Sequence, residues 1–488
     1  MKIEKITIQN YRCFKNLEIR FTKGVNILIG KNGTGKSTII NALRHIMSFL
    51  FAGNPGLKKD HPLYAFFASA EGLTIKSLNR SDAYYDEAIP DYCYPVSIKG
   101  EVTINDISIP EWGIIKKSAS GSTIKATKPD FANILHPPIL AVYSDAYPHV
   151  KTSINRQKYA KHILNGASIP QNFGYYQWGE ESSCTEVWEQ RFINLWKEII
   201  NKQVALQGYA DYTKEIVDTL MISLSEMKTI NEREELWGKI SQKNVEGRLI
   251  WQLYLLRMER EIITNSLVRF SQPVASDAAL SQYEIKGLEV VSRIERDYLS
   301  VRFVDGRSVL FQDLPAGYKR LFSIVLDITY RGFILQQRLS LSVKKPTPIT
   351  GVVVIDEIDL HLHPSLEQEV IQRLQRTFPD IQFIISTHSN LVIANMEEND
   401  RKNSIINLNY EHGEYTQSLL PNLFGVGYDY CLSDFMGTPP RNSHVKYLAE
   451  AYLRLEKRNE MNQAEKMKSE LAKLVKEENV DHIINSFR

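Results

Sequence analysis

The chain has 488 residues, 43% of them hydrophobic, and its 59 basic and 57 acidic residues give a formal net charge of +2. This length leaves room for about three or four domains, and the balanced charge predicts no general affinity for polyanions. The four cysteines are widely spaced, which argues against disulfides. The first residues lack a signal peptide's apolar core, and no apolar run reaches about 18 residues, which argues against secretion and a membrane span. These features together favour a cytoplasmic protein.

The N-terminal segment predicts two strands that lead into a phosphate-binding loop. Residues 2–9 and 17–21 alternate like half-buried antiparallel strands, and an apolar strand is predicted at 25–29. A helix is predicted over 38–46. This order favours an ABC-type nucleotide-binding lobe over a kinase-like or helicase-like one. The sequence between the last strand and the helix is Gly30-Lys31-Asn32-Gly33-Thr34-Gly35-Lys36-Ser37, which matches G-x-x-x-x-G-K-[ST].

The residue types of this loop suit a nucleotide. Glycines let backbone N–H groups surround phosphate oxygens, and the positive end of the following helix adds attraction. Lys36 is expected to reach the β- and γ-phosphates, and the Ser37 hydroxyl is expected to ligate Mg²⁺. A strand before the loop and a helix after it argue against a chance match.

The middle of the chain is predicted to be mainly helical. Strands at 97–104 and 138–143 come first. From about residue 150 to 274, apolar and aromatic residues recur at three-to-four spacing, which predicts a helical insertion of roughly one domain. Its aromatic rings could stack on nucleic-acid bases, but the helical spacing favours a packed core.

A glycine-containing turn follows two further strands. Strands are predicted at 288–294 and 298–304, and the turn Asp305-Gly306 predicts a hairpin into a further strand at 308–311. The glycine-containing turn comes next and opens an apolar helix over 321–330, whose N-terminus could meet a phosphate. The residues of this turn are Leu314, Pro315, Ala316, Gly317 and Tyr318, followed by Lys319 and Arg320.

Two strand ends carry the side chains expected to catalyse hydrolysis. The strand at 351–355 ends in Asp356 and Glu357. Asp356 is expected to hold Mg²⁺, and Glu357 to orient and deprotonate the attacking water. A strand at 381–389 carries His388 near its tip, where a neutral histidine could bind the γ-phosphate and report its loss.

A nearby group of Asp359, His361 and His363 allows two interpretations. Histidines and carboxylates bind Zn²⁺, so a metal site is one of them. However, the two histidines are two positions apart and cannot share a helix face. A loop that contacts a neighbouring subunit is therefore the preferred interpretation.

The end of the chain is predicted to be a helical tail. Apolar stripes at 447–455 and 464–474, separated by a break at 458–462, predict a helical hairpin. It could cap the core or bind another protein. The predicted organisation of this α/β protein is a P-loop lobe at 1–149, a helical insertion at 150–285, the second part of the head at 286–424 and a tail at 425–488.

These motifs together resemble the ABC-type P-loop ATPases of the RecF/SMC/OLD group. Within that group the chain is similar to the PtuA ATPases of Septu-type phage defence, also found beside some retrons, through residues 314–328 and the tail from Leu432 to Gly437 with Arg441. The segments that carry the wider resemblance are Asn10-Tyr11-Arg12, the P-loop, Leu314–Arg320, Asp356–Pro364 and Ser386-Thr387-His388-Ser389.

The resemblance implies how ATP and Mg²⁺ are held. It implies a head-to-tail homodimer, or a higher homo-oligomer, in which residues 30–38 of one chain, Thr38 included, and the signature Leu314–Tyr318 of another enclose each ATP. It also implies that Arg12 contacts the nucleotide and that Asp359 and His361 form the D-loop. Pro315 and Ala316 depart from the usual serine and a frequent glycine, so slow hydrolysis or an ATP-held assembly is expected. The glutamine loop of such ATPases is not identified.

The resemblance also implies a nuclease partner of the HNH type, similar to PtuB. About 100 residues follow His388, and they lack the Asp-x-Asp pair of a Toprim nuclease, so we expect the nuclease to be another chain. The expected function is an ATPase, producing ADP and phosphate, that acts as sensor and scaffold of an antiphage complex. The alternative is a RecF/SMC-like DNA-binding ATPase in DNA repair, and DNA or a retron nucleic acid is a candidate partner. A transporter subunit is less favoured because the insertion is long.

Overall fold

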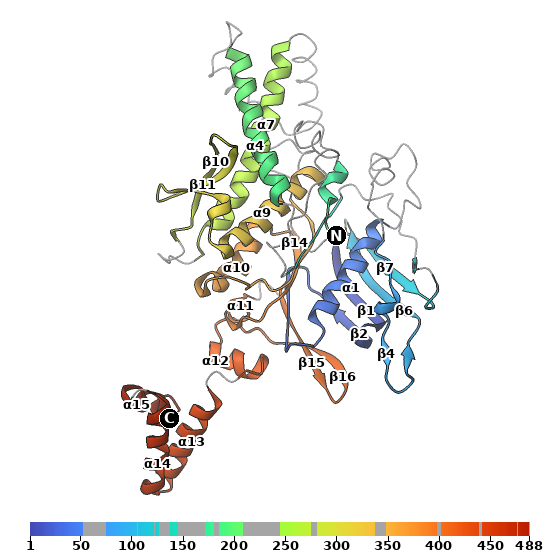
Figure 1. Cartoon of the computed structure of the whole chain (residues 1–488). Coiled ribbons are helices and arrows are strands. Elements are labelled where there is room, and N and C mark those ends of the chain that lie inside the picture. Colours follow the sequence, from blue (N-terminus) through green and yellow to red (C-terminus); the bar gives the residue numbers. More distant parts are fainter. Residues whose placement is uncertain are drawn as a thin grey trace. The chain divides into compact units, whose positions relative to one another are not determined.

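The structure is a computed structural model in which the chain divides into two compact units, Met1–Phe424 and Gly425–Arg488. Figure 1 shows the course of the chain. The residues that it describes are 1–51, 75–104, 106–121, 123–125, 137–144, 171–179, 185–207, 245–274, 281–336, 348–397, 402–438, 442–475 and 477–487.

An antiparallel sheet at the N-terminus has the strand order β2-β1-β6-β7-β8. The predicted antiparallel pair, β1 and β2, is confirmed. β7 was not predicted because Pro110 and Gly113 interrupt its alternation, and its register with β6 shifts between Gly100 and Val102. The strands span Lys2–Tyr11 (β1), Phe14–Arg20 (β2), Val96–Ile104 (β6), Ile107–Lys116 (β7) and Thr123–Lys125 (β8).

The central sheet has the order β16-β15-β3-β14-β13-β9, with five parallel strands and β16 antiparallel at one edge. β3, β9, β13 and β14 are almost wholly buried, as expected for a parallel sheet covered on both faces. β14 lies between β3 and β13 and is parallel to both, so the C-terminal ends of these three strands lie side by side along one edge of the sheet. The strands span Val25–Gly30 (β3), Ile139–Tyr143 (β9), Gly351–Ile355 (β13), Ile381–Ser386 (β14), Ser404–Glu411 (β15) and Glu414–Leu419 (β16).

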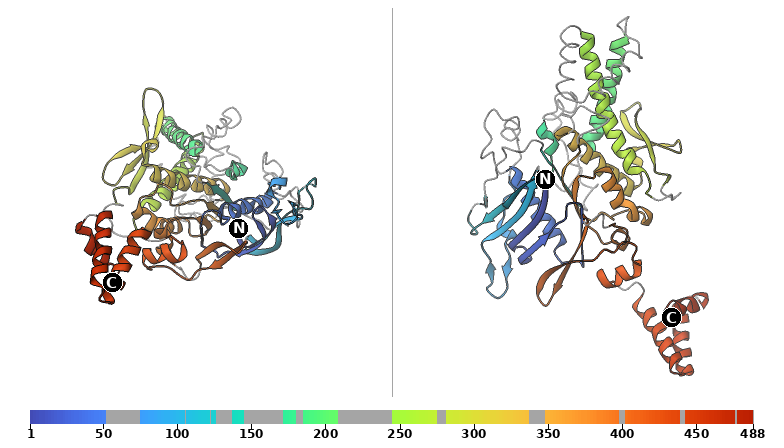
Figure 2. Two further views of the ribbon diagram at one scale, coloured as in Figure 1. Left: turned by 60° about the horizontal axis from the view of Figure 1, so that its bottom comes forward. Right: turned by 180° about the vertical axis from the view of Figure 1, so that it is seen from behind.

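Helices cover both faces of the central sheet (Figures 1 and 2). α1, Lys36–Ser48, packs between the two sheets, where Trp112 Nε1 of β7 donates a hydrogen bond of 2.7 Å to the Ile46 carbonyl. α9, which is buried from Gly317 onward except at Lys319, and α10 lie on the other face. The bounds are Ala316–Leu335 for α9 and Pro364–Thr377 for α10.

The described part of the helical insertion is a pair of long helices that pack on each other and on α9. α4 spans Thr185–Gln207 and α7 spans Val245–Ser271. Trp188, Phe192 and Leu253 are buried, so these side chains form a packed core, as predicted, and are not available for stacking on bases. Residues 150–170 and 208–244 of the predicted insertion lie outside the described residues, and its boundaries at 150 and 285 stay predictions.

A small three-stranded sheet confirms the predicted hairpin. β10, β11 and β12 are antiparallel neighbours, and the chain turns between the last two at Gly306, which has φ +90°. A two-stranded hairpin lies earlier in the chain. The strands span Ile285–Ser292 (β10), Asp297–Phe303 (β11), Ser308–Leu310 (β12), Tyr85–Asp86 (β4) and Asp91–Tyr92 (β5).

A buried polar cluster joins the insertion to the head. The Asp327 carboxylate on α9 accepts hydrogen bonds from Tyr143 Oη of β9 at 2.7 Å, from Arg331 Nε at 2.8 Å and from Trp188 Nε1 of α4. The Trp188 ring stacks on Tyr330 with centroids 5.0 Å apart. Because buried polar groups need their partners, this cluster fixes how α4, α9 and β9 pack together.

We expect Asp327→Ala to lower the free energy of unfolding by about 3–5 kcal/mol, because it leaves the Arg331 guanidinium buried without its carboxylate. Urea unfolding followed by circular dichroism measures this loss. Asp380→Ala, at an exposed position before β14, is the matched control and should stay within about 0.5 kcal/mol of the wild type. Equal losses in the two variants would contradict the role given to this cluster.

The second unit confirms the predicted helical hairpin and adds to it. Asn459, with φ +58°, lies in the turn between α13 and α14, and a third helix, α15, was not predicted. Tyr447 and Leu474, assigned to the apolar stripes, are 64% and 53% exposed because they face away from the three-helix core. Arg441 lies outside the described residues. The unit comprises α12 Tyr428–Tyr430, a π-helical turn Cys431–Phe435, α13 Ser443–Lys457, α14 Met461–Leu474 and α15 Glu477–Asn485.

Candidate nucleotide-binding site

The phosphate-binding loop joins β3 to α1 and contains three glycines with positive φ. Gly30 (φ +148°), Gly33 (+85°) and Gly35 (+94°) adopt conformations that L side chains rarely take. A Cβ on Gly30 would lie 2.5 Å from the Leu408 carbonyl oxygen, and one on Gly35 would overlap the Phe14 ring. At Gly33 no described atom lies within 4 Å of that position, so the tip of the loop is open to a ligand.

The Lys36 side chain folds back over this loop. Its Nζ donates hydrogen bonds of 2.7 Å to the Gly30 carbonyl and 3.2 Å to the Lys31 carbonyl. Burial lowers the pKa of Lys36, while the carboxylates of Asp356 and Glu357 act in the opposite direction. The ammonium group therefore lies near both the loop and the acids of the neighbouring strand.

The start of α1 suits an anion. Among the described residues, no side chain caps this N-terminus, so its first N–H groups remain for a ligand. Ser37 is exposed on the first turn, and Thr38 Oγ1 lies 3.7 Å from Cys13 Sγ in the β1–β2 turn. Lys31 and Asn32 are exposed, whereas the Thr34 hydroxyl donates 2.8 Å to the Lys31 carbonyl and braces the loop.

The acidic pair follows β13 and is held by the neighbouring strand. Ser386 Oγ, at the end of β14, donates to Asp356 Oδ1 and accepts a 2.8 Å hydrogen bond from the Glu357 N–H. Glu357 has φ +48°, which is unusual for a residue with a side chain. Sequence reasoning included Ser386 in a motif but did not predict that its hydroxyl orients both acids.

The signature helix, α9, is bonded to the loop that carries the acidic pair, residues 356–358, which we call the acidic loop. The Arg320 guanidinium, fully buried on α9, donates hydrogen bonds of 2.8 Å to the Asp356 carbonyl, 2.7 Å to the Glu357 carbonyl and 3.2 Å to the Ile358 carbonyl. Local sequence gives no signal for this contact, because the partners are 36 to 38 positions apart.

The signature turn exposes backbone and turns its large side chains inward. Pro315 precedes the first residue of α9, and no described side chain caps this N-terminus. Pro315 and Ala316 are exposed, whereas Leu314 and Tyr318 are buried. The Tyr318 ring stacks on Tyr283 with centroids 4.0 Å apart, so it packs within its own head. Any ligand contact at this turn therefore involves the exposed start of the helix.

The D-loop is linked to His388, which we call the switch histidine because it is expected to sense the γ-phosphate. The Asp359 carboxylate accepts hydrogen bonds from Thr387 Oγ1 and, at 3.2 Å, from the His388 N–H, while the His388 ring is exposed. His361 is exposed with φ +63°. His363 Nδ1 accepts from the Ser365 N–H at 3.3 Å and caps α10. The side chains of Asp359 and His363 therefore bond different groups: Asp359 accepts from Thr387 and His388, and His363 accepts from Ser365.

Arg12 lies in the turn that adjoins the phosphate-binding loop. Its guanidinium forms an ion pair of 3.0 Å with Asp82, and its N–H donates 2.8 Å to the Asp82 carbonyl. The neighbouring Cys13 contacts Thr38, which places this turn beside the start of α1. Asp82, 70 positions away in the chain, was not foreseen as the residue that positions Arg12.

The sheet brings together most of the predicted site residues. Because β3, β14 and β13 are parallel neighbours, the P-loop, the switch histidine and the acidic pair follow adjacent strand ends at one edge. These residues fit a magnesium nucleotide, with a glycine cradle for phosphates and hydroxyl and carboxylate oxygens for the ion. The signature turn starts α9 on the opposite face of the sheet from α1 (Figures 1 and 2).

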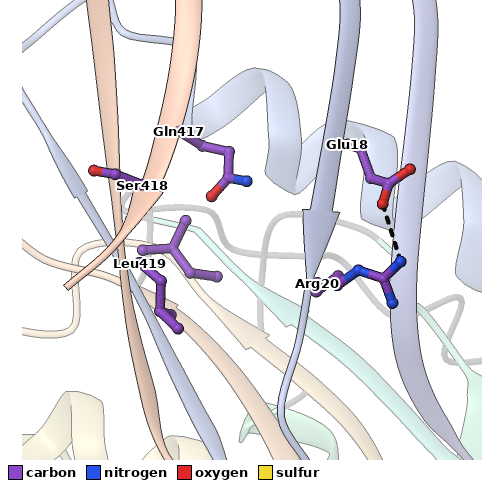
Figure 3. A pocket seen from close by; sticks show the side chains of 6 residues that line it. Glu18, Arg20, Gln417, Ser418 and Leu419 are labelled. Carbon is purple, nitrogen blue, oxygen red and sulfur yellow. Dashed lines mark ion pairs between the residues drawn. The ribbon is translucent and has the colours of Figure 1, made fainter. Parts of the chain in front are cut away.

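A pocket of about 270 Å³ lies elsewhere, between the edge strands β2 and β16 (Figure 3). An ion pair of 3.4 Å joins Glu18 and Arg20 on one side. Leu419, on the other side, is 67% exposed. The predicted site residues do not line this pocket, and it has no glycine cradle, so the strand-end site remains the candidate.

The arrangement is that of a P-loop ATPase, and the antiparallel sheet packed over α1 makes it an ABC-type head. The family model of the AAA ATPase domain matches residues 1–393. The chain therefore belongs to this ATPase family, and the predicted α/β ABC-type fold is confirmed. No described helix has the length and apolar character needed to cross a membrane.

Curated relatives indicate which ATPases of this family the chain is similar to. The chain is 27% identical to the Retron Vc95 probable ATPase of Vibrio cholerae serotype O1 biovar El Tor, over 81% of this chain and 71% of that protein. It is 24% identical to the Retron Ec83 probable ATPase of Escherichia coli, over 92% and 79%. A shorter match, 32% identical over 26% of this chain and 16% of the other, is to the Septu protein PtuA of Bacillus mycoides (strain KBAB4). The predicted resemblance to retron-associated ATPases and PtuA is confirmed.

Proposed function

We propose that this chain is the ATP-hydrolysing sensor and scaffold of an antiphage defence complex and that it controls an associated HNH-type nuclease. The observation that carries the ATPase part is the meeting of the P-loop, the acidic pair and the switch histidine at one sheet edge. The defence part is supported by the names of its relatives, two retron ATPases and a Septu protein. The proposed compartment is the cytosol, which the widely spaced cysteines favour.

The proposed hydrolysis assigns one task to each side chain. Lys36 and the loop N–H groups bind the β- and γ-phosphates, and Ser37 and Asp356 would hold Mg²⁺, which neutralises phosphate charge. Glu357 accepts a proton from the water that attacks the γ-phosphorus as the bond to ADP breaks. His388, whose ring is exposed next to this pair, hydrogen-bonds the γ-phosphate.

The proposed assembly has two copies around each nucleotide. Within one chain, α1 and α9 begin on opposite faces of the central sheet, and the exposed start of α9 has N–H groups for an anion. A head-to-tail partner would place Pro315 to Gly317 over the ATP of the other chain. Light scattering of the Glu357→Gln variant tests this: a mass that doubles or more on adding ATP supports it, and an unchanged mass with ATP bound excludes it.

We expect Ser386→Ala to raise the Mg²⁺ concentration needed for half-maximal hydrolysis by about 10-fold or more, because the Ser386 hydroxyl orients the Asp356 carboxylate. A magnesium titration of ATPase rates measures this shift. Ser404→Ala is the matched control, since it removes a buried hydroxyl that bonds Asn26 on an adjacent strand, away from the acids. An equal shift in both variants would show that Ser386 has no special role at the ion.

Control of a nuclease is tested by co-expression. The chain is produced with an HNH-type protein encoded beside it, and phage plating is compared for wild type, Lys36→Ala and a nuclease-dead partner. The proposal expects co-purification and protection that needs both activities. Protection that persists without the partner would remove the nuclease from the proposed function, whereas protection lost only with the partner's active site supports it.

A DNA-binding ATPase of the RecF/SMC type is the second candidate. The observation in its favour is the tip of the β10–β11 hairpin, where Arg293 and Arg296 lie 5.5 and 4.6 Å from the Tyr298 ring centroid and Ile294 is fully exposed. Basic and apolar side chains together suit duplex binding. An ATP-dependent mobility shift of DNA that weakens steeply with salt would favour this candidate, and no shift at low salt would remove it.

A further inference from the structure

Arg320 connects two segments that the proposed function assigns to different nucleotides. It lies on α9, about one turn after the signature, and its guanidinium donates to three consecutive backbone carbonyls of the acidic loop, those of Asp356, Glu357 and Ile358. The side chain is fully buried. Charge-assisted hydrogen bonds of this kind are stronger than neutral ones, so they hold the loop backbone firmly.

The residue that these bonds surround needs such support. Glu357 has φ +48°, a conformation that costs energy for a residue with a Cβ and persists only where its surroundings enforce it. Ser386 holds its N–H from the side of β14, and Arg320 holds its carbonyl from the side of α9. The direction of the Glu357 side chain is therefore set from two sides.

The start of α9 contacts the same loop. A Cβ on Gly317 would overlap the His361 carbonyl, so helix and D-loop backbones are in direct contact here. Pro315 and Ala316, immediately before Gly317, are exposed. A displacement of the exposed start of the helix would thus move Arg320 and, through it, the loop that carries Glu357.

We propose that Arg320 is a positioning residue that couples the signature turn to the catalytic base of its own chain. Contact of a second chain's nucleotide with the start of α9 then sets Glu357 for hydrolysis at this chain's site. This inference rests on the proposed ATPase function. It assigns to Arg320 an effect on the rate of hydrolysis and none on ATP binding, because these three hydrogen bonds go to the loop backbone.

The test replaces the planar guanidinium group of Arg320 by a single ammonium group. Arg320→Lys keeps the charge but cannot reach three carbonyls in the same geometry. We expect kcat to fall by about 10- to 100-fold, with KM and the Kd for ATP within about twofold of the wild type. If this variant does not fold, Arg320→Gln is used, with the same expectation. An unchanged kcat in a folded variant overturns the inference.

A double-mutant cycle separates positioning from general damage. In the Glu357→Gln background the base is already absent, so Arg320→Lys should change the residual single-turnover rate by less than twofold. A further loss equal to that seen in the wild-type background would show that Arg320 does not act through Glu357 and overturns the inference.

A second buried arginine provides the matched control. Arg373 on α10 is fully buried and donates to the Glu369 carboxylate and, at 3.0 Å, to the Ser271 carbonyl, away from the acidic loop. Arg373→Lys should lower Tm as Arg320→Lys does while leaving kcat unchanged. An equal loss of kcat in both variants overturns the inference. Absence of ATP hydrolysis by the wild type would instead refute the proposed function, on which the inference depends.

Discussion

Replacing Lys36 by alanine is expected to weaken ATP binding by about 100-fold or more, which at ordinary assay concentrations abolishes it. The ammonium group lies beside the glycine cradle, where it bonds the Gly30 and Lys31 carbonyls. Each hydrogen bond to a charged phosphate oxygen is worth about 1.5–3 kcal/mol, so losing two of them corresponds to this factor. Calorimetric titration with ATP and Mg²⁺ measures the change in Kd.

Lys23→Ala is the control for this experiment. Lys23 is exposed just before β3, at the end of that strand opposite to the phosphate-binding loop. Its replacement should leave the Kd unchanged. If Lys36→Ala bound ATP as tightly as the wild type, the nucleotide site would have to lie elsewhere. The proposed two-copy arrangement would then have no basis.

Glu357→Gln is expected to retain ATP binding and to slow hydrolysis by about 10²- to 10⁴-fold, the usual contribution of a general base. The amide has the size of the carboxylate but cannot accept the proton of the attacking water. Because Ser386 and Arg320 bond the Glu357 backbone, the substitution leaves the loop geometry intact. Single-turnover hydrolysis and the Kd for ATP, measured on the same preparation, separate the two effects.

Glu414→Gln is the matched substitution for this second experiment. It makes the same chemical change at an exposed position on β16 and should leave the rate within twofold of the wild type. Normal hydrolysis by the Glu357→Gln variant would mean that another group activates the water. His388, with its exposed ring on the adjacent strand end, would be the next residue to replace.

The local motifs of the head could be predicted because each is contiguous in the chain. A short apolar strand precedes each of them: the P-loop, the Asp356-Glu357 pair and His388. A strand followed by a polar turn spans only about ten residues, so it can be recognised from local sequence. β15 and β16 were not predicted. Five of the six residues of β16 are exposed, and four of these five carry polar side chains, so this edge strand lacks the buried alternation that predicts a strand.

The amino-acid sequence by itself determined the chemistry of this protein: the phosphate-binding glycines, the lysine, the two acids and the family they indicate. Only the tertiary structure decided how those groups are held. Arg320 bonds the acidic loop, Ser386 orients Asp356, and Asp82 fixes Arg12, over separations of 36, 30 and 70 positions. The pattern of apolar and polar residues around a position indicates whether its side chain is buried. The distant residue that the side chain bonds depends on how strands and helices pack, and no short segment specifies that packing.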